Sequence, residues 1–204
     1  MLFFPGYYSF IPELSGQVIP FSALRELNRV FSYSLPALAL LWYLVLEKKS
    51  LAVNSANLKP EKKDLFSFLW AFPGLALIAA GINFIGAGFS SFTAPIVEAP
   101  VDALGWIAVG LSCVGTGYLE ESFFRFYLLQ KLESRVPQKT ARILFSVLLF
   151  AVCHVYEGPL GIMNAALAGF LLSIIFTQYR TLHGIAWAHA LYNSLVYIFS
   201  FLSG

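Results

Sequence analysis

The chain predicts an all-α, polytopic membrane helix bundle, and three observations point to this class. Hydrophobic residues make up 58% of its 204 residues, whereas charged residues make up only 12%, about half the share typical of a soluble domain. The mean hydropathy is +0.73. The hydrophobic residues also gather into separate runs, several of which approach the roughly 20 residues that a helix needs to cross the hydrocarbon core of a bilayer.

Six apolar runs predict about six transmembrane helices. They are Val30–Leu46, Leu65–Ile85, Leu104–Leu129, Ile143–Tyr156, Gly161–Tyr179 and Ile185–Phe201. The fourth run is short, which favours burial among neighbouring helices or local thinning of the bilayer. Upstream of the first run, residues 1–20 are rich in Phe and Tyr and contain three prolines. This composition predicts an interfacial segment at the lipid headgroups rather than a cleavable signal peptide.

We expect one integral membrane domain in two parts. Residues 1–103 would hold the N-terminal interfacial segment and two membrane helices, and residues 104–204 would hold a catalytic core of four membrane helices. The sequence shows no sign of a separate soluble domain, so the function is expected to lie within the bilayer. The prolines and scattered glycines inside the runs are tolerated in packed membrane helices.

The distribution of charge predicts an orientation. Lysine and arginine concentrate in residues 47–64 and 130–142, whereas the alternating connections carry acidic residues and no Lys or Arg. Because cytoplasmic loops carry the excess of positive charge, both termini should lie on the non-cytoplasmic side. Arg25 and Arg29, just before the first run, are a weak signal in the opposite direction.

Composition also argues against a nucleic-acid-binding protein and against a site built from cysteines. No basic cluster interleaved with aromatic residues indicates a nucleic-acid partner. The two cysteines, Cys113 and Cys153, lie within apolar runs. We interpret them as buried free thiols rather than as a disulfide or a thiolate metal site.

Two adjacent glutamates lie inside the third apolar run, where a carboxylate costs a few kcal/mol. Glu121 and Arg125 are four residues apart and share a helix face, so they can pair. Glu120 points about 100° away and has no partner in its own helix. Low dielectric disfavours the charged form of such a carboxylate, which suits it to proton transfer near neutral pH. We therefore assign Glu120 to chemistry, and Glu121 and Arg125 to support. The alternative is that both glutamates form ion pairs that only lock helices together.

Polar groups on two further helices can complete a reaction site. His154 lies near the end of the fourth run, and His189 and Asn193 share one face of the sixth. Imidazole and amide groups can together stabilise an oxyanion, although for each group alone an interhelical hydrogen bond is the plainer interpretation. The rise per residue of a helix places these groups and Glu120 at depths in the membrane that differ by about 8 Å. This difference argues against a common site for them but does not exclude one. His183, in the inner turn, is expected to be solvated or interfacial.

A zinc site is a second interpretation of the same groups. Two histidines and one carboxylate with an open position form a known catalytic zinc pattern, and His154, His189 and Glu120 supply those groups. The sequence lacks the H-E-x-x-H helix that normally marks such a site. We expect no cofactor, and zinc stays the alternative.

These residues resemble the CAAX protease and bacteriocin-processing (CPBP) family of intramembrane endopeptidases, which includes the type II CAAX prenyl endopeptidases. The resemblance covers roughly residues 105–200. Three motifs carry it in order, namely E-E-x-x-x-R at Glu120, Glu121 and Arg125, F-x-x-x-H at Phe150 and His154, and H-x-x-x-N at His189 and Asn193.

The resemblance implies a glutamate-dependent intramembrane endopeptidase in a bacterial inner membrane. If the matching residues keep the roles that they have in the family, Glu120 and His154 activate the water that attacks a peptide carbonyl. His189 and Asn193 then hold the oxyanion, and Glu121 and Arg125 orient the site. The implied substrate is a membrane-anchored protein or peptide, with prenylated peptides and sorting signals as two possibilities.

Two other classes of function stay open. One is a non-catalytic immunity or binding protein of the same fold, although no motif residue is lost. The other is a proton-coupled transporter, which the absence of an evident inverted repeat disfavours.

Overall fold

The computed structural model describes residues 18–47, 58–87 and 96–202. Most of the expected N-terminal interfacial segment, residues 1–17, lies outside the described residues, as do residues 48–57 in the expected cytoplasmic loop.

The described chain is helical, which confirms the predicted all-α class. Its helices are α1 (Ala23–Glu47), α2 (Lys62–Ala87), α3 (Ala103–Glu120), η2 (Glu121–Leu129), α4 (Gln130–Glu133), α5 (Lys139–Cys153), η3 (Val155–Glu157), α6 (Gly158–Tyr179) and α7 (His183–Leu202). The described strands are two two-residue segments, β1 (Val18–Ile19) and β2 (Ile96–Val97), which pair in parallel. This pair joins the chain just before α1 to the chain just before α3.

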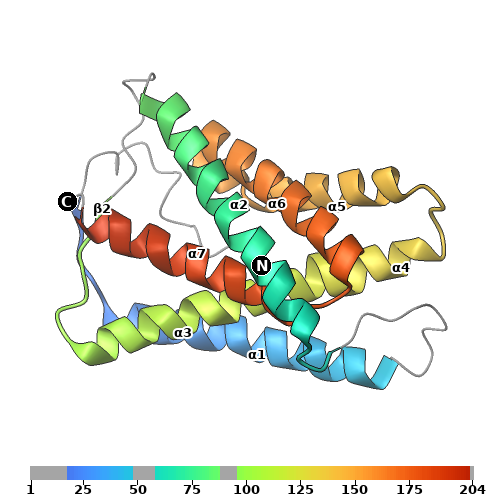
Figure 1. The fold of residues 1–204 in the computed structure, drawn as a ribbon. Coiled ribbons are helices and arrows are strands. Elements are labelled where there is room, and N and C mark those ends of the chain that lie inside the picture. Colours follow the sequence, from blue (N-terminus) through green and yellow to red (C-terminus); the bar gives the residue numbers. More distant parts are fainter. Residues whose placement is uncertain (1–17, 48–57, 88–95, 203–204) are drawn as a thin grey trace.

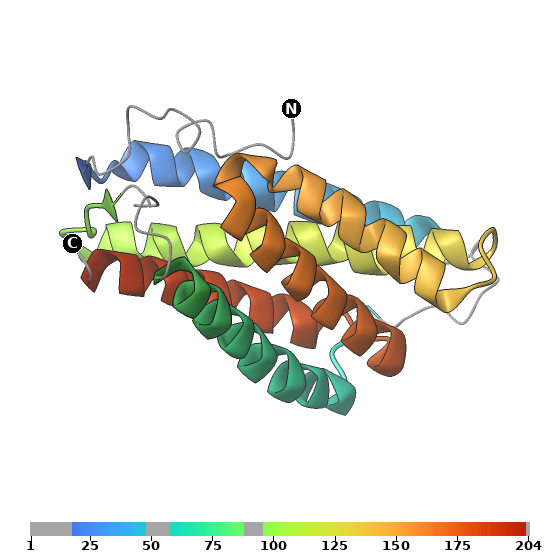
Figure 2. The same cartoon turned by 90° about the horizontal axis from the view of Figure 1, so that it is seen from above.

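The described residues form a bundle of six helical rods, because α3, η2 and α4 follow one another without a break from Ala103 to Glu133. Neighbouring rods contact in the order α1, α3, α7, α2, α6 and α5, and η2 touches α5 and α6. The two views show α1, α3, α7 and α2 side by side, with α5 and α6 lying across them (Figures 1 and 2). The helices of residues 1–103 are therefore packed against those of residues 104–204.

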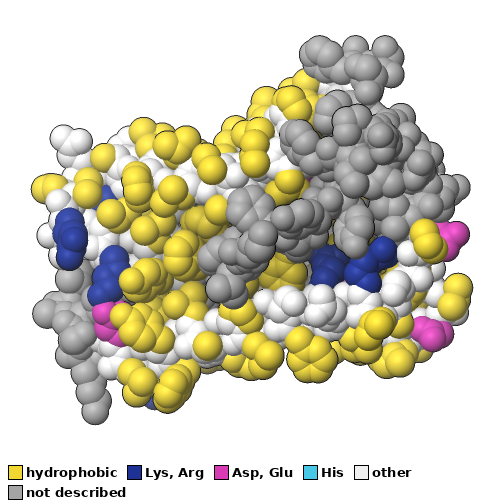
Figure 3. Space-filling view, turned by 180° about the vertical axis from the view of Figure 1, so that it is seen from behind, with side chains coloured by type: hydrophobic (Ala, Val, Ile, Leu, Met, Phe, Trp, Pro, Cys, Tyr) yellow, Lys and Arg dark blue, Asp and Glu magenta, His cyan; other side chains and the backbone are white. Residues whose placement is uncertain are grey.

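The surface of the bundle suits a lipid environment. Four rods in the described part of the chain are long and apolar enough to cross a membrane, namely Ala23–Glu47, Lys62–Gly86, Ala103–Glu133 and Val155–Tyr179. Large apolar side chains point outward on them, such as Leu77 and Phe84 of α2, which are 74% and 84% exposed. Hydrophobic side chains are spread widely over the described part of the face shown in Figure 3. The protein is an integral membrane protein.

The short fourth rod ends where the sequence places His154. Helix α5 has only 15 residues and finishes at Cys153, and His154 caps it with φ −105° and ψ 13°. A single 3-10 turn, η3, then leads to Gly158, whose φ of 77° favours glycine. The connection expected between the fourth and fifth runs, at residues 157–160, is shifted toward the N-terminus, because α5 ends at Cys153 and α6 already begins at Gly158. This tight reversal leaves His154 at the end of its helix.

The third rod is not a continuous α-helix, contrary to the sequence-based expectation. Residues Glu121–Leu129 form a π-helix of nine residues. π-Helical turns are rare and often lie at functional sites, and this one begins at the second motif glutamate. Hydrophobic periodicity does not distinguish a π-turn from an α-turn over so short a stretch.

Candidate active site

The foundation of the site is a fully buried ion pair. Arg125 Nη1 lies 2.8 Å from Glu121 Oε1, and neither side chain is exposed. Arg125 also donates from Nη2 to the carbonyl oxygen of Gly169 in α6, at 3.3 Å. Its guanidinium lies 4.5 Å from the ring centroid of Phe150 in α5. The predicted pairing of Glu121 with Arg125 is confirmed, and the arginine also joins η2 to two neighbouring helices.

His189 of α7 bridges the two glutamates. Its Nδ1 lies 2.8 Å from Glu121 Oε1, and its Nε2 lies 3.7 Å from Glu120 Oε2. Glu121 thus receives both Arg125 and His189 on one carboxylate oxygen. The partner that Glu120 lacks in its own helix comes from α7. This arrangement fixes the orientation of the imidazole ring and turns Nε2 toward Glu120.

The tautomer of a neutral His154 is fixed by a backbone contact. Nδ1 lies 2.8 Å from the carbonyl oxygen of Phe150. A carbonyl oxygen only accepts hydrogen bonds, so Nδ1 carries a proton and donates it. In the neutral ring, Nε2 then keeps its lone pair and is able to accept a proton. The ring lies against Phe150, with centroids 4.5 Å apart, and stacks on Tyr156 at 6.1 Å.

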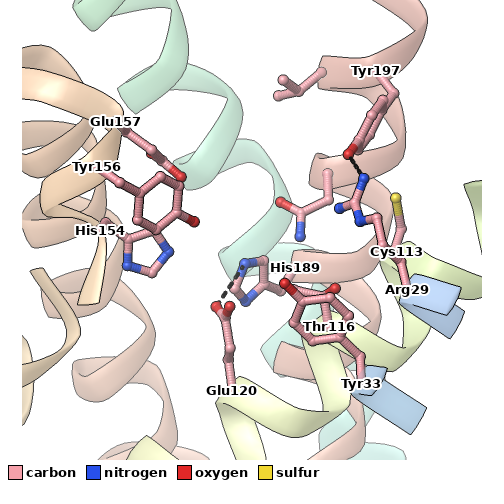
Figure 4. A pocket seen from close by; sticks show the side chains of 12 residues that line it. Arg29, Tyr33, Cys113, Thr116, Glu120, His154, Tyr156, Glu157, His189 and Tyr197 are labelled. Carbon is pink, nitrogen blue, oxygen red and sulfur yellow. Dashed lines mark hydrogen bonds and ion pairs between the residues drawn. The ribbon is translucent and has the colours of Figure 1, made fainter. Parts of the chain in front are cut away.

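These side chains meet at one cavity of about 360 Å³. Twelve residues from α1, α3, η3, α7 and the end of α5 line it, namely Arg29, Tyr33, Cys113, Thr116, Glu120, His154, Tyr156, Glu157, His189, Asn193, Val196 and Tyr197. Figure 4 shows Glu120 and His189 joined on one wall, with His154, Tyr156 and Glu157 across from them. Such a cavity offers a carboxylate that can act as a base, together with hydrogen-bond donors.

The structure brings together the four residues that the sequence assigns to chemistry. Glu120, His154, His189 and Asn193 all line the cavity, so the estimated difference in depth does not keep them apart. Glu121 and Arg125 lie behind the cavity wall and are fully buried. Whether each residue has its expected role stays a prediction.

A family comparison bears on the same region. Residues 102–195 match the model of the family described as type II CAAX prenyl endopeptidase Rce1-like. The resemblance to the CAAX protease family is confirmed. The matched segment contains all three motifs and supports a CAAX-type, protease-like function in the membrane. No curated protein and no solved structure matches the chain.

Helix α1 lies outside the segment that matches the CAAX protease family, yet it contributes to the cavity. Arg29 and Tyr33 are one helical turn apart and both line it. The sequence alone does not indicate them, because Arg29 serves there only as a topology signal and Tyr33 belongs to no motif. Only the packing of α1 against α3 places these residues at the site.

Tyr197 and Glu157 are two further polar residues of the cavity wall that the sequence does not assign to the site, and His183 is interfacial rather than solvated. Tyr197 lies about two turns beyond His189 on α7, so helical spacing places it near the same face. Glu157 lies in the connection that the sequence predicts between the fourth and fifth runs, and no motif marks it. His183 is not solvated: it is half-buried, its Nε2 donates to the carbonyl oxygen of Leu58 and its Nδ1 accepts from Tyr118, each at 2.9 Å. It ties helices together away from the cavity.

The zinc alternative requires Glu120, His154 and His189 to surround one metal ion. Among the residues that the structure describes, no group of three or more His, Cys, Asp or Glu side chains is arranged to hold a metal ion. Glu120 and His189 are close, whereas His154 lies on the opposite wall (Figure 4).

Proposed function

We propose that this protein is an intramembrane endopeptidase in which Glu120 and His154 activate a water molecule. The observation that supports this most directly is the cavity itself. Carboxylate, imidazole and amide groups from α3, α7 and the end of α5 converge there, on a buried Glu121–Arg125 pair. Burying so many polar groups in an apolar bundle is costly unless they serve a purpose.

The proposed reaction begins with a water molecule between the two walls of the cavity. The water oxygen attacks the carbon of the peptide carbonyl while Glu120 takes a proton from the water. His154 accepts a hydrogen bond from the same water through Nε2. The carbonyl π bond breaks and leaves an oxyanion. When the C–N bond breaks, the proton held by Glu120 passes to the leaving amine.

Asn193 and His189 are proposed to hold that oxyanion. Asn193 offers two N–H donors and lies one turn beyond His189 on α7. His189 Nδ1 is engaged by Glu121, so Nε2 donates to the oxyanion only when the ring is doubly protonated. Donors held in place before the reaction are the usual source of oxyanion stabilisation.

The substrate is proposed to be a membrane-anchored protein or peptide in a bacterial inner membrane, with both termini of the enzyme on the non-cytoplasmic side. The matched family is described by prenyl endopeptidase activity, so prenylated C-terminal peptides are the first class to test. The lipid-facing surface of the bundle suits substrates that arrive within the bilayer.

The decisive experiment compares membrane-protein fragments, identified by mass spectrometry, in cells that express equal amounts of wild type or Glu120→Gln. The substitution removes the proposed base at nearly constant volume and should reduce turnover at least about 100-fold. Glu98→Gln is the matched control, because Glu98 is exposed and lies outside the cavity.

Fragments that appear with wild type and Glu98→Gln, but not with Glu120→Gln, support the proposal and identify the substrate. Identical fragment profiles favour the non-catalytic binding protein. The same comparison with purified protein after strong chelation tests metal dependence, since loss of cleavage that zinc restores would favour the zinc mechanism.

A further inference from the structure

A second cavity, of about 470 Å³, adjoins the proposed active site. It lies among α2, α6 and α7, and α2 packs against both of the other helices. Glu157 and Val196 line this cavity as well as the first one. The other lining residues are Ala79, Ile82, Asn83, Gly86, Leu160, Gly161, Asn164 and Tyr192. Glu157 and Val196 therefore form the boundary between the two cavities.

Among the described residues that line the second cavity, Glu157 is the one that carries a charge. It is exposed, and none of the ion pairs between described residues includes it. Its carboxylate receives a hydrogen bond from the neutral hydroxyl of Tyr156 and makes no capping hydrogen bond to α6. A carboxylate without a cation is costly in an apolar bundle, so this position favours a ligand with a positive charge.

The neutral wall of the second cavity suits the rest of a basic side chain. Lysine and arginine lay their methylene groups along apolar surface and direct the charged end to polar partners, and Leu160 and Val196 provide such surface. The charged ends of both side chains are donors only. Asn83 and Asn164 line the cavity with amide groups whose oxygens accept hydrogen bonds. The Nδ2 of Asn164 donates to the hydroxyl of Tyr192 at 3.2 Å, which leaves its oxygen for a ligand.

The charged end of this cavity lies close to the proposed chemistry. Glu157 follows His154 by three residues of a 3-10 turn, which corresponds to a rise of about 6 Å. Figure 4 shows both side chains on the wall across from Glu120. An extended peptide advances about 3.3 Å per residue, so two residues cover a similar distance. On α7, Tyr192 of the second cavity directly precedes Asn193 of the first.

We propose that the second cavity is a specificity pocket for a lysine or arginine side chain of the substrate, whose charged end binds Glu157. The basic residue lies within two positions of the bond that is cleaved. This inference rests on the proposed function, because it places the scissile carbonyl beside Glu120 and His154. It gives α2, outside the family match, a part in substrate selection, since α2 supplies one wall of the pocket.

Binding of a small cation tests the pocket without a known substrate. The probe is 4-aminobenzamidine, whose amidinium resembles the end of an arginine side chain, and 4-aminobenzamide is its neutral analogue of the same shape. Isothermal titration calorimetry gives the Kd of each for the full-length protein in phosphatidylcholine nanodiscs. We expect the amidine to bind about 10- to 100-fold more tightly than the amide, as a charge-assisted hydrogen bond predicts.

Two kinds of substitution should remove this preference. Glu157→Gln should bring the ratio of the two affinities toward one, and Glu157→Lys should abolish binding of the amidine by repulsion. Glu98→Gln is the matched control, because Glu98 is exposed and lies outside both cavities. If the Glu157 variants do not fold, Ala79→Phe provides a second test. It places a ring in the second cavity from α2 and should weaken the amidine at least about 10-fold.

Three results would overturn the proposal. They are equal affinity for the amidine and the amide, a preference for the amidine that survives both Glu157→Gln and Ala79→Phe, and no binding of either compound. Displacement of the amidine by phosphatidylethanolamine, with a dependence on Glu157, would assign the pocket to a lipid headgroup and would also overturn it.

The cleavage sites in the cellular fragments separate this inference from the proposed function. With wild type we expect lysine or arginine within two residues of the cleaved bonds, and Glu157→Lys should shift this preference toward aspartate and glutamate. Amidine binding that depends on Glu157, without any cleaved fragment, supports the pocket and contradicts the peptidase. Cleavage with no basic residue near the cleaved bonds supports the peptidase and contradicts the pocket.

Discussion

At the scale of single residues, the site depends on how two adjacent glutamates are divided between structure and chemistry. Glu121 is fully buried and accepts Arg125 and His189, each at 2.8 Å. Glu120 faces the cavity, and its Oε2 is buried with no hydrogen-bond partner among the described residues. Neighbours on one helix point in different directions, so a single dipeptide supplies both a support and a proposed base.

Asn193→Ala tests the proposed oxyanion donor. We expect kcat for the cleaved peptide to fall about 100- to 1,000-fold, with a smaller change in KM, because the lost hydrogen bond is strongest in the transition state. Steady-state kinetics with a substrate identified from the cellular fragments would measure both constants. A change in KM with kcat preserved would argue against this role.

Arg125→Ala tests the buried pair. Removal of the guanidinium leaves Glu121 buried without its cation, so the free energy of unfolding should fall by about 3–5 kcal/mol. Unfolding in mixed SDS micelles would measure the change. Arg135→Ala is the control, because Arg135 is exposed and should alter stability by less than about 0.5 kcal/mol. Equal stabilities of the two variants would contradict the pairing.

At the scale of elements, the site depends on close helix contacts made by glycine. A Cβ on Gly117 of α3 would lie 2.9 Å from the carbonyl oxygen of Ala186 in α7. This approach brings the helices of Glu120 and His189 together. On the side of α7 that faces α2, the backbone N–H of Gly184 donates to Asp64 Oδ1 at 2.8 Å, and Asp64 is fully buried. Small residues allow backbones to approach in this way in membrane bundles.

Gly184→Ala should separate α7 from α2. The added Cβ would lie 2.0 Å from the carbonyl oxygen of Asp64, which is backbone and must shift. We expect a loss of about 1–3 kcal/mol in the free energy of unfolding, as overpacking predicts.

Gly81→Ala in α2 is the matched control for that substitution. No atom lies within 4 Å of its added Cβ, so it should be neutral or raise stability by up to about 1 kcal/mol through helix propensity. Equal stabilities of the two alanine variants, measured by unfolding in SDS micelles, would show that the contact at Gly184 is unimportant.

At the scale of the whole molecule, the cavity is assembled from both ends of the chain. Helix α1 supplies Arg29 and Tyr33, whereas α7 supplies His189, Asn193 and Tyr197. Helix α2 packs between α6 and α7. The helices of residues 1–103 therefore take part in the site and in the bundle that supports it, beyond the segment that carries the family motifs.

The predicted orientation is testable with two cysteines at opposite ends of the third rod. Glu98 lies before the rod and Arg135 lies after it. The rod itself, Ala103–Glu133, has 31 residues and spans about 46 Å. In a Cys113→Ala, Cys153→Ala background, a membrane-impermeant maleimide should label Glu98→Cys in intact spheroplasts. It should label Arg135→Cys only after permeabilisation. The opposite pattern would reverse the proposed topology.

The sequence by itself determined the membrane class, the six apolar runs and the pairing of Glu121 with Arg125. These features follow from composition and from spacing along one helix, which are local properties. Phe150, His154, His189 and Asn193 were also recognisable, because the three motifs preserve order and spacing along the chain.

Only the tertiary structure decided which groups from different helices meet. It placed His189 between the two glutamates, closed the α5–α6 turn so that His154 lies at the cavity, and brought Arg29 of α1 to its far end. It also showed the π-helix at Glu121–Leu129. Such contacts depend on crossing geometry and on close approaches at Gly117 and Gly184. Helical periodicity shows which residues share a face but not which helix that face contacts.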